Sequence, residues 1–206
     1  MAKPFRPVRA LAATAAALAI AFVVAACTVG SQGVVIAPKL SNDARDIGRN
    51  RSVHLTVVDA RPSALIGYRK TETGDQARVE STGNPVAAVQ SAMEVALEDK
   101  GFSLAQSARD TDNHLTVEIR EIGYEASGKY VAPSVTTRAV FKAIARRGGT
   151  TFEQTYRLEK QDREALPLTS ERNARLINET VSEVLTMLAD DIELLGFLAG
   201  DPAPRR

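Results

Sequence analysis

Residues 135–159 read VTTRAVFKAIARRGGTTFEQTYRLE, a pattern that predicts two antiparallel strands joined by a tight turn. Small or apolar residues alternate with polar ones from Val135 to Arg146, which is typical of a strand with one buried face. The next four residues, Arg147-Gly148-Gly149-Thr150, include two glycines, which readily adopt the positive φ angles of a hairpin turn. The side chains expected to point inward are Ala139, Phe141, Ala143, Ala145, Phe152, Tyr156 and Leu158.

The opposite face of this predicted hairpin is charged. Its outward residues are Arg138, Lys142 and Arg146 on the first strand, and Glu153, Arg157 and Glu159 on the second. The basic stripe, with Val140 and Ile144 between its members, could dock an anionic partner or lipid headgroups. Because charge runs usually lie on solvated faces, we favour a solvated sheet face with cross-strand pairs to Glu153 and Glu159.

Further strands are predicted elsewhere in the chain. Residues 53–58 and 115–119 alternate between apolar and polar side chains, and residues 102–104 form a short apolar stretch. From Pro62 through Gly67 to Gly83 the sequence is rich in turn-forming and polar residues, so we expect a turn region there.

Two helices are predicted. Asn84 as N-cap and Pro85 at the first helical position open one, and Gly101 ends it in a left-handed conformation. Thr169 or Ser170 caps the other, which is expected to run to about Phe197. Its apolar stripe, expected to pack on the sheet, includes Ile177, Val181, Leu185, Leu188 and Ile192.

The order of these elements is β-α-β-β-β-β-α, which predicts an α+β fold: an antiparallel sheet of about five strands with two helices packed on one face. We expect this domain to span residues 51–199 and a polar tail to follow at 200–206.

The N-terminus has the pattern of a bacterial secretion signal. Residues 1–10 are positively charged, and Leu11 to Ala26 is an apolar run too short for a membrane span. The run closes with Val24-Ala25-Ala26-Cys27, which resembles the lipobox of bacterial lipoproteins. That resemblance implies cleavage between Ala26 and Cys27, a diacylglyceryl group on the Cys27 thiol, and acylation of the freed amine, for example by palmitate.

The residues that follow suggest a location. Thr28 stands where aspartate retains enteric lipoproteins at the inner membrane, so we expect an outer-membrane lipoprotein whose domain faces the periplasm. Residues 27–50 carry the lipid and are predicted to form a tether, with room for one short edge strand at Val34-Val35-Ile36.

Composition narrows the classes of partner. The full chain has a net charge of +1, and residues 1–26 hold three of its 26 basic residues and none of its 25 acidic ones, so the mature chain is at −2. A chain so close to neutral lacks the basic footprint that nucleic-acid binding requires. Nucleic acid is therefore excluded as a partner. Because of the lipid anchor, the expected partners are the membrane and another envelope protein.

We expect no cofactor, no bound metal and no catalytic residue. Gly123 to Lys129 matches G-x-x-x-x-G-K, but Tyr130 replaces the required Ser or Thr, so we favour a turn between strands. Asp110-Thr111-Asp112-Asn113 has the start of a calcium loop, with Glu121 at the twelfth position, but Leu115 stands where that loop needs glycine. A polar turn is favoured there too.

His54 and His114 have no second ligand at metal-binding spacing, which favours structural roles for both histidines. Composition leaves a Ser-His-Asp triad open, but no G-x-S-x-G elbow occurs.

Several short stretches, in their order along the chain, resemble the YajG-type bacterial lipoproteins. They are the lipobox, Val35 to Pro38, Val57 to Arg61, Leu65 to Arg69, Leu97 to Phe102, the Leu115 strand, Ile177 to Val181, and Val184-Leu185. The resemblance implies an envelope location and a fold, but no activity. Asp59 and Arg61 lie at a strand end within one of these stretches, and we favour a local ion pair beside a turn at Gly67 over a functional site.

These observations lead to one expected function and two alternatives. We expect a lipid-anchored envelope lipoprotein that is a non-enzymatic binding or structural component. The alternatives are an accessory subunit of an envelope transport or assembly machine and, less favoured, an enzyme acting on lipid or peptidoglycan.

Overall fold

The computed structural model describes residues 30–41, 43–70, 74–129, 132–163 and 168–201. The chain divides into Met1–Gly30 and Ser31–Arg206, and every element described below belongs to the second unit. The expected signal peptide, its cleavage site at Ala26 and the lipidation site at Cys27 lie outside the described residues.

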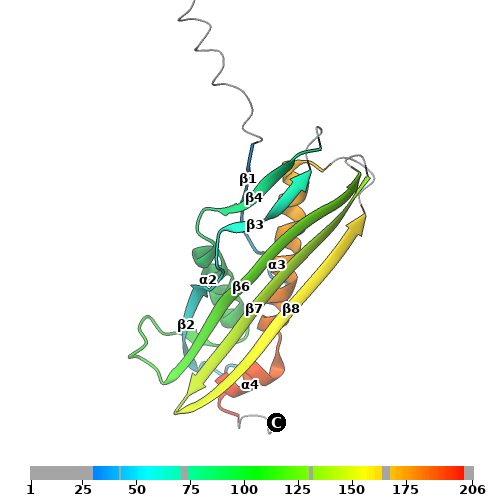
Figure 1. Cartoon of the computed structure of the whole chain (residues 1–206). Coiled ribbons are helices and arrows are strands. Elements are labelled where there is room, and N and C mark those ends of the chain that lie inside the picture. The colour runs from blue at the N-terminus through cyan, green and yellow to red at the C-terminus, as the bar shows by residue number, and fades with distance from the viewer. Residues whose placement is uncertain (1–29, 42, 71–73, 130–131, 164–167, 202–206) are drawn as a thin grey trace, which may run out of the picture. The chain divides into compact units, whose positions relative to one another are not determined.

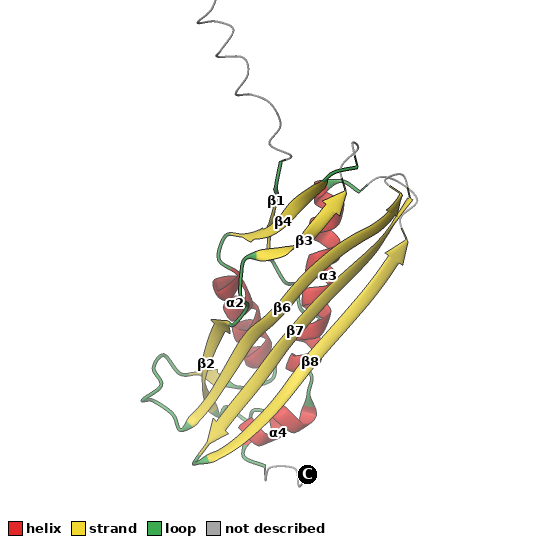
Figure 2. Cartoon of the chain, viewed as in Figure 1, coloured by secondary structure: helices red, strands yellow, loops and turns green. Residues whose placement is uncertain are grey.

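The unit is of the α+β class, with eight strands and three helices in its described part (Figures 1 and 2). The strands are β1 (Gln32–Val35), β2 (Ser52–Asp59), β3 (Leu65–Lys70), β4 (Gln76–Thr82), β5 (Ser103–Leu104), β6 (Asn113–Lys129), β7 (Ala132–Arg147) and β8 (Thr150–Arg163). The helices are α2 (Pro85–Asp99), α3 (Ser170–Ala189) and α4 (Ile192–Ala199). The expected five strands and two helices were therefore too few.

The long antiparallel strands β6, β7 and β8 form the centre of the fold. The hairpin predicted at Arg147 to Thr150 is confirmed: β7 and β8 pair from Ser134↔Arg163 to Arg147↔Thr150. Gly148 and Gly149 in the turn have φ angles of +49° and +83°. The inward side chains predicted on β7, including Phe141, are buried against the helices, as are Phe152 and Tyr156 on β8.

The sheet is mixed, and the expectation of an antiparallel sheet was wrong in this respect. One edge of β6 pairs with β7, and the other edge is shared by two parallel strands. β2 pairs with the first part of β6, from His54↔His114 to Asp59↔Ile119, and β3 pairs with its later part at Gly67↔Tyr124 and Tyr68↔Glu125. Parallel pairing follows from a connection that crosses over the sheet, and residue alternation within a strand carries no information about such a connection.

Residues 62–83 were expected to be a turn region, but they contain the antiparallel pair β3 and β4. β4 also pairs in parallel with β1, which places this pair near one edge of the sheet. Neither strand shows a long apolar alternation, because each has little of its surface buried. Pairing with β6 and β1 therefore decides the structure of this segment.

The first predicted helix is confirmed at both ends. Asn84 Oδ1 accepts a hydrogen bond from the Ala87 backbone N–H at 3.0 Å, and Pro85 is the first helical residue. Gly101 follows the C-cap with φ +81°. All three helices lie on the same side of the sheet (Figure 2), with α2 against β2 and α3 against β7 and β8.

The second predicted helix is divided into two. Thr169 is its N-cap, as expected, but α3 ends at Ala189. The Asp191 side chain then caps α4 by accepting hydrogen bonds from the Glu193 and Leu194 backbone N–H groups, at 2.8 and 3.1 Å. The break removes Ile192 from the predicted inward stripe and leaves it 69% exposed. The rest of the stripe, Ile177, Val181, Leu185 and Leu188, is buried in the core as predicted.

The described part of the expected tether is packed on the domain. Val34 and Ile36 are buried in the core, and residues 36–41 run along α3 in an extended form. Three backbone N–H groups donate to side chains of α3: Ala37 to Asn178 Oδ1 (2.7 Å), Lys39 to Ser182 Oγ (2.9 Å) and Ser41 to Thr186 Oγ1 (3.3 Å). Two extended residues and four helical residues both advance about 6–7 Å, so this spacing matches along the segment.

Candidate functional site

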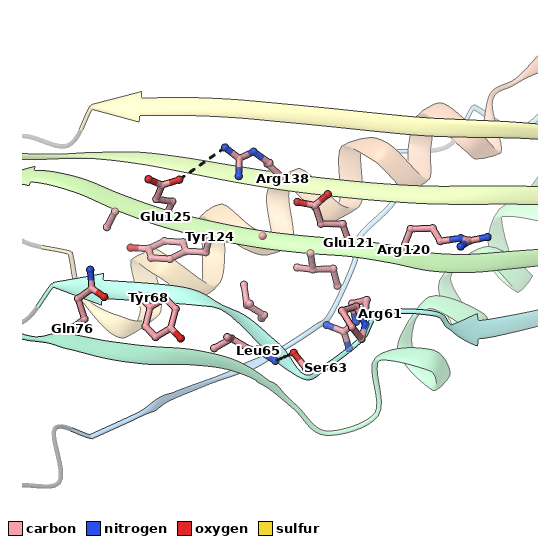
Figure 3. Close-up of a pocket in the computed structure, with 15 residues that line it drawn as sticks. Arg61, Ser63, Leu65, Tyr68, Gln76, Arg120, Glu121, Tyr124, Glu125 and Arg138 are labelled. Atoms are coloured by element: carbon pink, nitrogen blue, oxygen red, sulfur yellow. Dashed lines mark hydrogen bonds and ion pairs between the residues drawn. The ribbon is translucent and has the colours of Figure 1, made fainter.

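The outer face of the sheet, away from the helices, has a groove of about 480 Å³ between β3 and β6 (Figure 3). β2 stays paired with β6 only as far as Asp59↔Ile119, and β3 joins β6 only at Gly67↔Tyr124. Residues 120–123 of β6 therefore have no strand partner on that edge among the described residues. The register shift between Ile119 and Glu121 in the β6–β7 pairing marks a bulge beside the same place.

Gly67 allows β3, which forms one wall of the groove, to lie directly against β6. A Cβ atom at this position would lie 1.7 Å from the Tyr124 carbonyl oxygen, so only glycine allows the two backbones to approach this closely. Gly67 was expected in a turn, but it lies inside β3. Its conformational role is therefore close strand contact rather than chain reversal.

The ion pair expected between Asp59 and Arg61 is present at one end of the groove. Arg61 Nε donates to Asp59 Oδ1 at 2.8 Å, and Arg61 Nη2 donates to Asp59 Oδ2 at 2.7 Å and to Ser81 Oγ at 3.1 Å. The hydrogen bond from Arg61 is the main reason that the pKa of Asp59 lies below its ordinary value. The Arg61 side chain is only 5% exposed, and its Nη1 atom is buried without a hydrogen-bond partner in the described part of the chain.

The cross-strand pairs expected on the outer face are also present. Arg138 Nε lies 2.6 Å from Glu159 Oε2, and Lys142 Nζ lies 2.6 Å from Glu153 Oε2. These contacts raise the pKa of Arg138 and lower the pKa of Glu153. Arg138 and Lys142 are therefore neutralised by their neighbours on β8, whereas Arg146 makes no ion pair within the described part of the chain.

The stretch from Gly123 to Lys129, which matches the phosphate-loop pattern, lies within a strand. Residues 123–129 belong to β6 and pair with β7 from Gly123↔Arg138 to Lys129↔Ala132. They open no helix, and they also do not form the turn that the sequence favoured, because β6 extends further than its apolar alternation indicated.

The stretch from Asp110 to Asn113, which has the start of a calcium-loop pattern, belongs to a polar turn, as expected. Asp110 Oδ2 accepts from the Ser107 backbone N–H at 3.1 Å, and Thr111 Oγ1 donates to the Ser52 carbonyl at 3.0 Å. Asn113 Nδ2 donates to the Leu198 carbonyl at 2.9 Å, which ties the start of β6 to α4.

The structure brings the two histidines together, which their separation in the sequence did not indicate. His54 and His114 are paired across β2 and β6, with ring centroids 6.1 Å apart in an edge-to-face arrangement. His54 Nδ1 lies 3.2 Å from the Ala105 carbonyl oxygen. Over the described ranges, no group of three or more His, Cys, Asp or Glu residues is placed to hold a metal ion.

Several residues of the groove, among them Ser63, Tyr68 and Arg120, were not singled out as functional by the sequence. Ser63 and Tyr68 fell in the expected turn region, and Arg120 was one of several polar positions of an alternating strand. No local signal could have found them, because the groove exists only where β2 ends and β3 begins to pair.

In the described residues, no helix combines the length and the apolar character of a membrane span.

Comparison with known proteins gives a family and a fold. A family model described as "Uncharacterized lipoprotein" matches residues 38–199. No curated protein matches the sequence. A crystal structure of a protein from Xanthomonas campestris, carrying the DUF330 family model, is similar with a TM-score of 0.54 and 13% identity, over 81% of this chain and 97% of that one. A minor lipoprotein from Acinetobacter baumannii is less similar, with a TM-score of 0.40 and 12% identity over 76% and 98% of the two chains.

Proposed function

Because this chain belongs to a family of uncharacterized lipoproteins, of YajG type, we propose that it is a lipid-anchored envelope component that acts by binding. The anchor is Cys27, freed by cleavage after Ala26 and carrying a diacylglyceryl group and a further acyl chain. Each buried methylene contributes about 0.8 kcal/mol, so several acyl chains hold the protein at the membrane essentially permanently. Thr28 after the cysteine supports the outer membrane, with the domain facing the periplasm.

The anchor has a direct test. Cys27→Ser removes the thiol that accepts the lipid, so the variant is expected to keep residues 1–26 and to run as a larger, unlabelled precursor in cells fed a palmitate analogue. Density-gradient separation of the two membranes then locates the labelled wild-type protein. Normal maturation of the Cys27→Ser variant to the same length contradicts the proposed anchor, and labelled protein in the inner-membrane fraction contradicts only the proposed membrane.

The open face of the sheet is the observation that supports binding. The three helices pack on one side of β6, β7 and β8, and the other side carries charged side chains and the groove beside β3 (Figures 1 and 3). Arg138 and Lys142 on this face are each paired with a glutamate of β8, which neutralises those charges. The face therefore offers shape and polar contacts to a partner rather than a strong net charge. Such a surface suits a protein or peptide partner of the envelope, and we propose that the protein does not catalyse a reaction.

Site-specific crosslinking in intact cells tests this proposal. A photoreactive residue at Thr155, which is exposed on β8 opposite Lys142, is expected to give a defined adduct that mass spectrometry identifies. The matched control is Met187, which is 48% exposed on α3 in the helix layer. Adducts from Met187 alone contradict docking by the sheet face. A stoichiometric complex that survives purification identifies the protein as a subunit of an envelope machine.

A further inference from the structure

The guanidinium of Arg61 is only partly used by the protein itself. Its Nε and Nη2 atoms are engaged by Asp59 and Ser81, while Nη1 has no hydrogen-bond partner among the described residues. A buried donor without an acceptor costs free energy, so native proteins rarely keep one without a reason. The same residue lines the groove between β3 and β6, which supplies room for an acceptor.

The groove is polarised along its length. Arg61 and Arg120 lie toward the end next to β2, with Glu121 between Arg120 and Arg138, and Glu125 lies at the other end beside Arg138 (Figure 3). Arg138 is itself paired with Glu159 at 2.6 Å, so Glu125 is the less neutralised charge at its end. Arg120 is paired with Glu118, but its side chain is 46% exposed, so it is accessible to a ligand. Glu125 is 65% exposed, and among the described residues its ion-pair contact is a long one of 3.9 Å with Arg138. A ligand that is negative at one end and positive at the other matches this arrangement.

Apolar surface and open backbone lie between the charged ends. The apolar surface is that of Leu65 and the half-exposed Tyr68 ring, because Ile66 and Ile122, which also line the groove, are only 6% and 3% exposed. Residues 120–123 of β6 have no strand partner on this edge in the described part of the chain. Four extended residues span about 13 Å, the length of a short peptide.

We propose that this groove binds the free carboxyl end of a short peptide, an inference that rests on the proposed binding function. The carboxylate accepts from Arg61 Nη1 with Arg120 beside it, an apolar side chain lies on Leu65 and the Tyr68 ring, and the peptide amine lies toward Glu125. Phosphate fits less well, because Glu121 and Glu125 line the groove and repel a dianion about twice as strongly as a single carboxylate. Asp59 already occupies the fork of the guanidinium, so Arg61 can offer only Nη1, which suits one carboxylate oxygen better than bidentate phosphate.

Calorimetry on the mature acylated protein in nonionic detergent tests the proposal. The probes are the tripeptide Ala-Leu-Ala with a free carboxylate, the same tripeptide as its C-terminal amide, and inorganic phosphate. The free acid is expected to bind at least tenfold more tightly than the amide and more tightly than phosphate. Equal affinity for acid and amide, or no binding of the acid, overturns the proposal, and tighter binding of phosphate replaces it with an oxyanion site.

Variants locate the bound carboxylate. Arg120→Gln is expected to weaken binding of the free acid at least fivefold and to leave binding of the amide unchanged. Arg61→Lys keeps the charge but cannot reach Asp59 and the ligand together, so it is expected to abolish the preference for the acid. Because Arg61→Lys can also disturb folding, Arg120→Gln is the decisive variant, and an unchanged affinity there overturns the proposal.

Arg78→Gln is the matched control, because Arg78 is 59% exposed and paired with Glu80 and does not line the groove, although it stands opposite Tyr68 in the β3–β4 pair. Its affinity for the free acid is expected to equal that of the wild type, and an equal loss in Arg78→Gln and Arg120→Gln contradicts the proposed site. If a partner is crosslinked at Thr155 but calorimetry shows no preference for the free-acid tripeptide, only this inference is removed. The proposed binding function then still stands.

Discussion

Lys100 Nζ lies 2.6 Å from Asp190 Oδ1, although the lysine side chain is only 2% exposed and the two residues are 90 positions apart. Lys100 is the C-cap of α2 and Asp190 is the C-cap of α3. The same ammonium donates to the Asp43 carbonyl at 2.8 Å. One buried charge therefore joins the ends of both helices to the segment that leads from β1 to β2, and it lies where helix dipoles favour a cation.

Replacing Lys100 by methionine tests this junction. Breaking a buried ion pair from one side costs about 3–5 kcal/mol, but Asp190 is 44% exposed and stays partly hydrated, so we expect a loss of about 2–3 kcal/mol. Denaturant unfolding of the purified protein measures the difference. The double variant Lys100→Met with Asp190→Asn is expected to recover part of the loss, and a single-variant loss below about 0.5 kcal/mol, the size of a surface effect, contradicts the junction.

Asn178 holds the segment that runs along α3. Its Nδ2 donates to the Val35 carbonyl at 3.0 Å, and its Oδ1 accepts from the Ala37 N–H at 2.7 Å. Asn178→Ala removes both bonds and is expected to cost about 1–3 kcal/mol. Hydrogen exchange at the Ala37 amide should become faster, whereas Glu179→Ala, one position further on α3, should leave it unchanged. Equal protection in both variants means that core burial of Val34 and Ile36 alone holds the segment.

Gly67→Ala tests the close contact of β3 with β6. Because the new methyl group meets the Tyr124 carbonyl oxygen, the two strands must separate, and the expected loss is at least about 3 kcal/mol, the upper range for overpacking. Gly30→Ala is the control, since nothing lies within 4 Å of a Cβ there. Thermal unfolding compares the two, and similar melting temperatures contradict the described contact.

The ion pair of Asp59 and Arg61 makes stability depend on pH. The pKa of Asp59 in the folded protein lies below its ordinary value of 3.8, so the pair contributes fully above that value and is lost as pH falls through the lower, folded pKa. Asp59→Asn is therefore expected to be less stable than the wild type at pH 6, with the difference shrinking toward pH 2.5. Urea midpoints across this range measure it. A difference that stays constant with pH indicates that the carboxylate charge plays no part.

Several elements could be predicted because their causes are local. The two glycines at 148 and 149 permit the hairpin turn whatever surrounds them, and Asn84 with Pro85 starts α2 through contacts within one helical turn. The break between α3 and α4 also has a local signal, because Asp191 is a good N-cap residue. The continuing apolar period concealed it, since the spacing from Leu188 to Ile192 fits one unbroken helix.

The sequence by itself determined the β7–β8 hairpin and the N-caps of α2 and α3, because side-chain period and backbone freedom are properties of neighbouring residues. The order of charged and apolar residues predicts the secretion and lipidation signal in the same local way. Only the tertiary structure decided that β2 and β3 share one edge of β6 and that a groove opens between them. It also decided that Lys100 is buried. The physical reason is the same in each case: strand partners and buried charges depend on surfaces supplied by distant segments, and no local pattern specifies which segment will supply them.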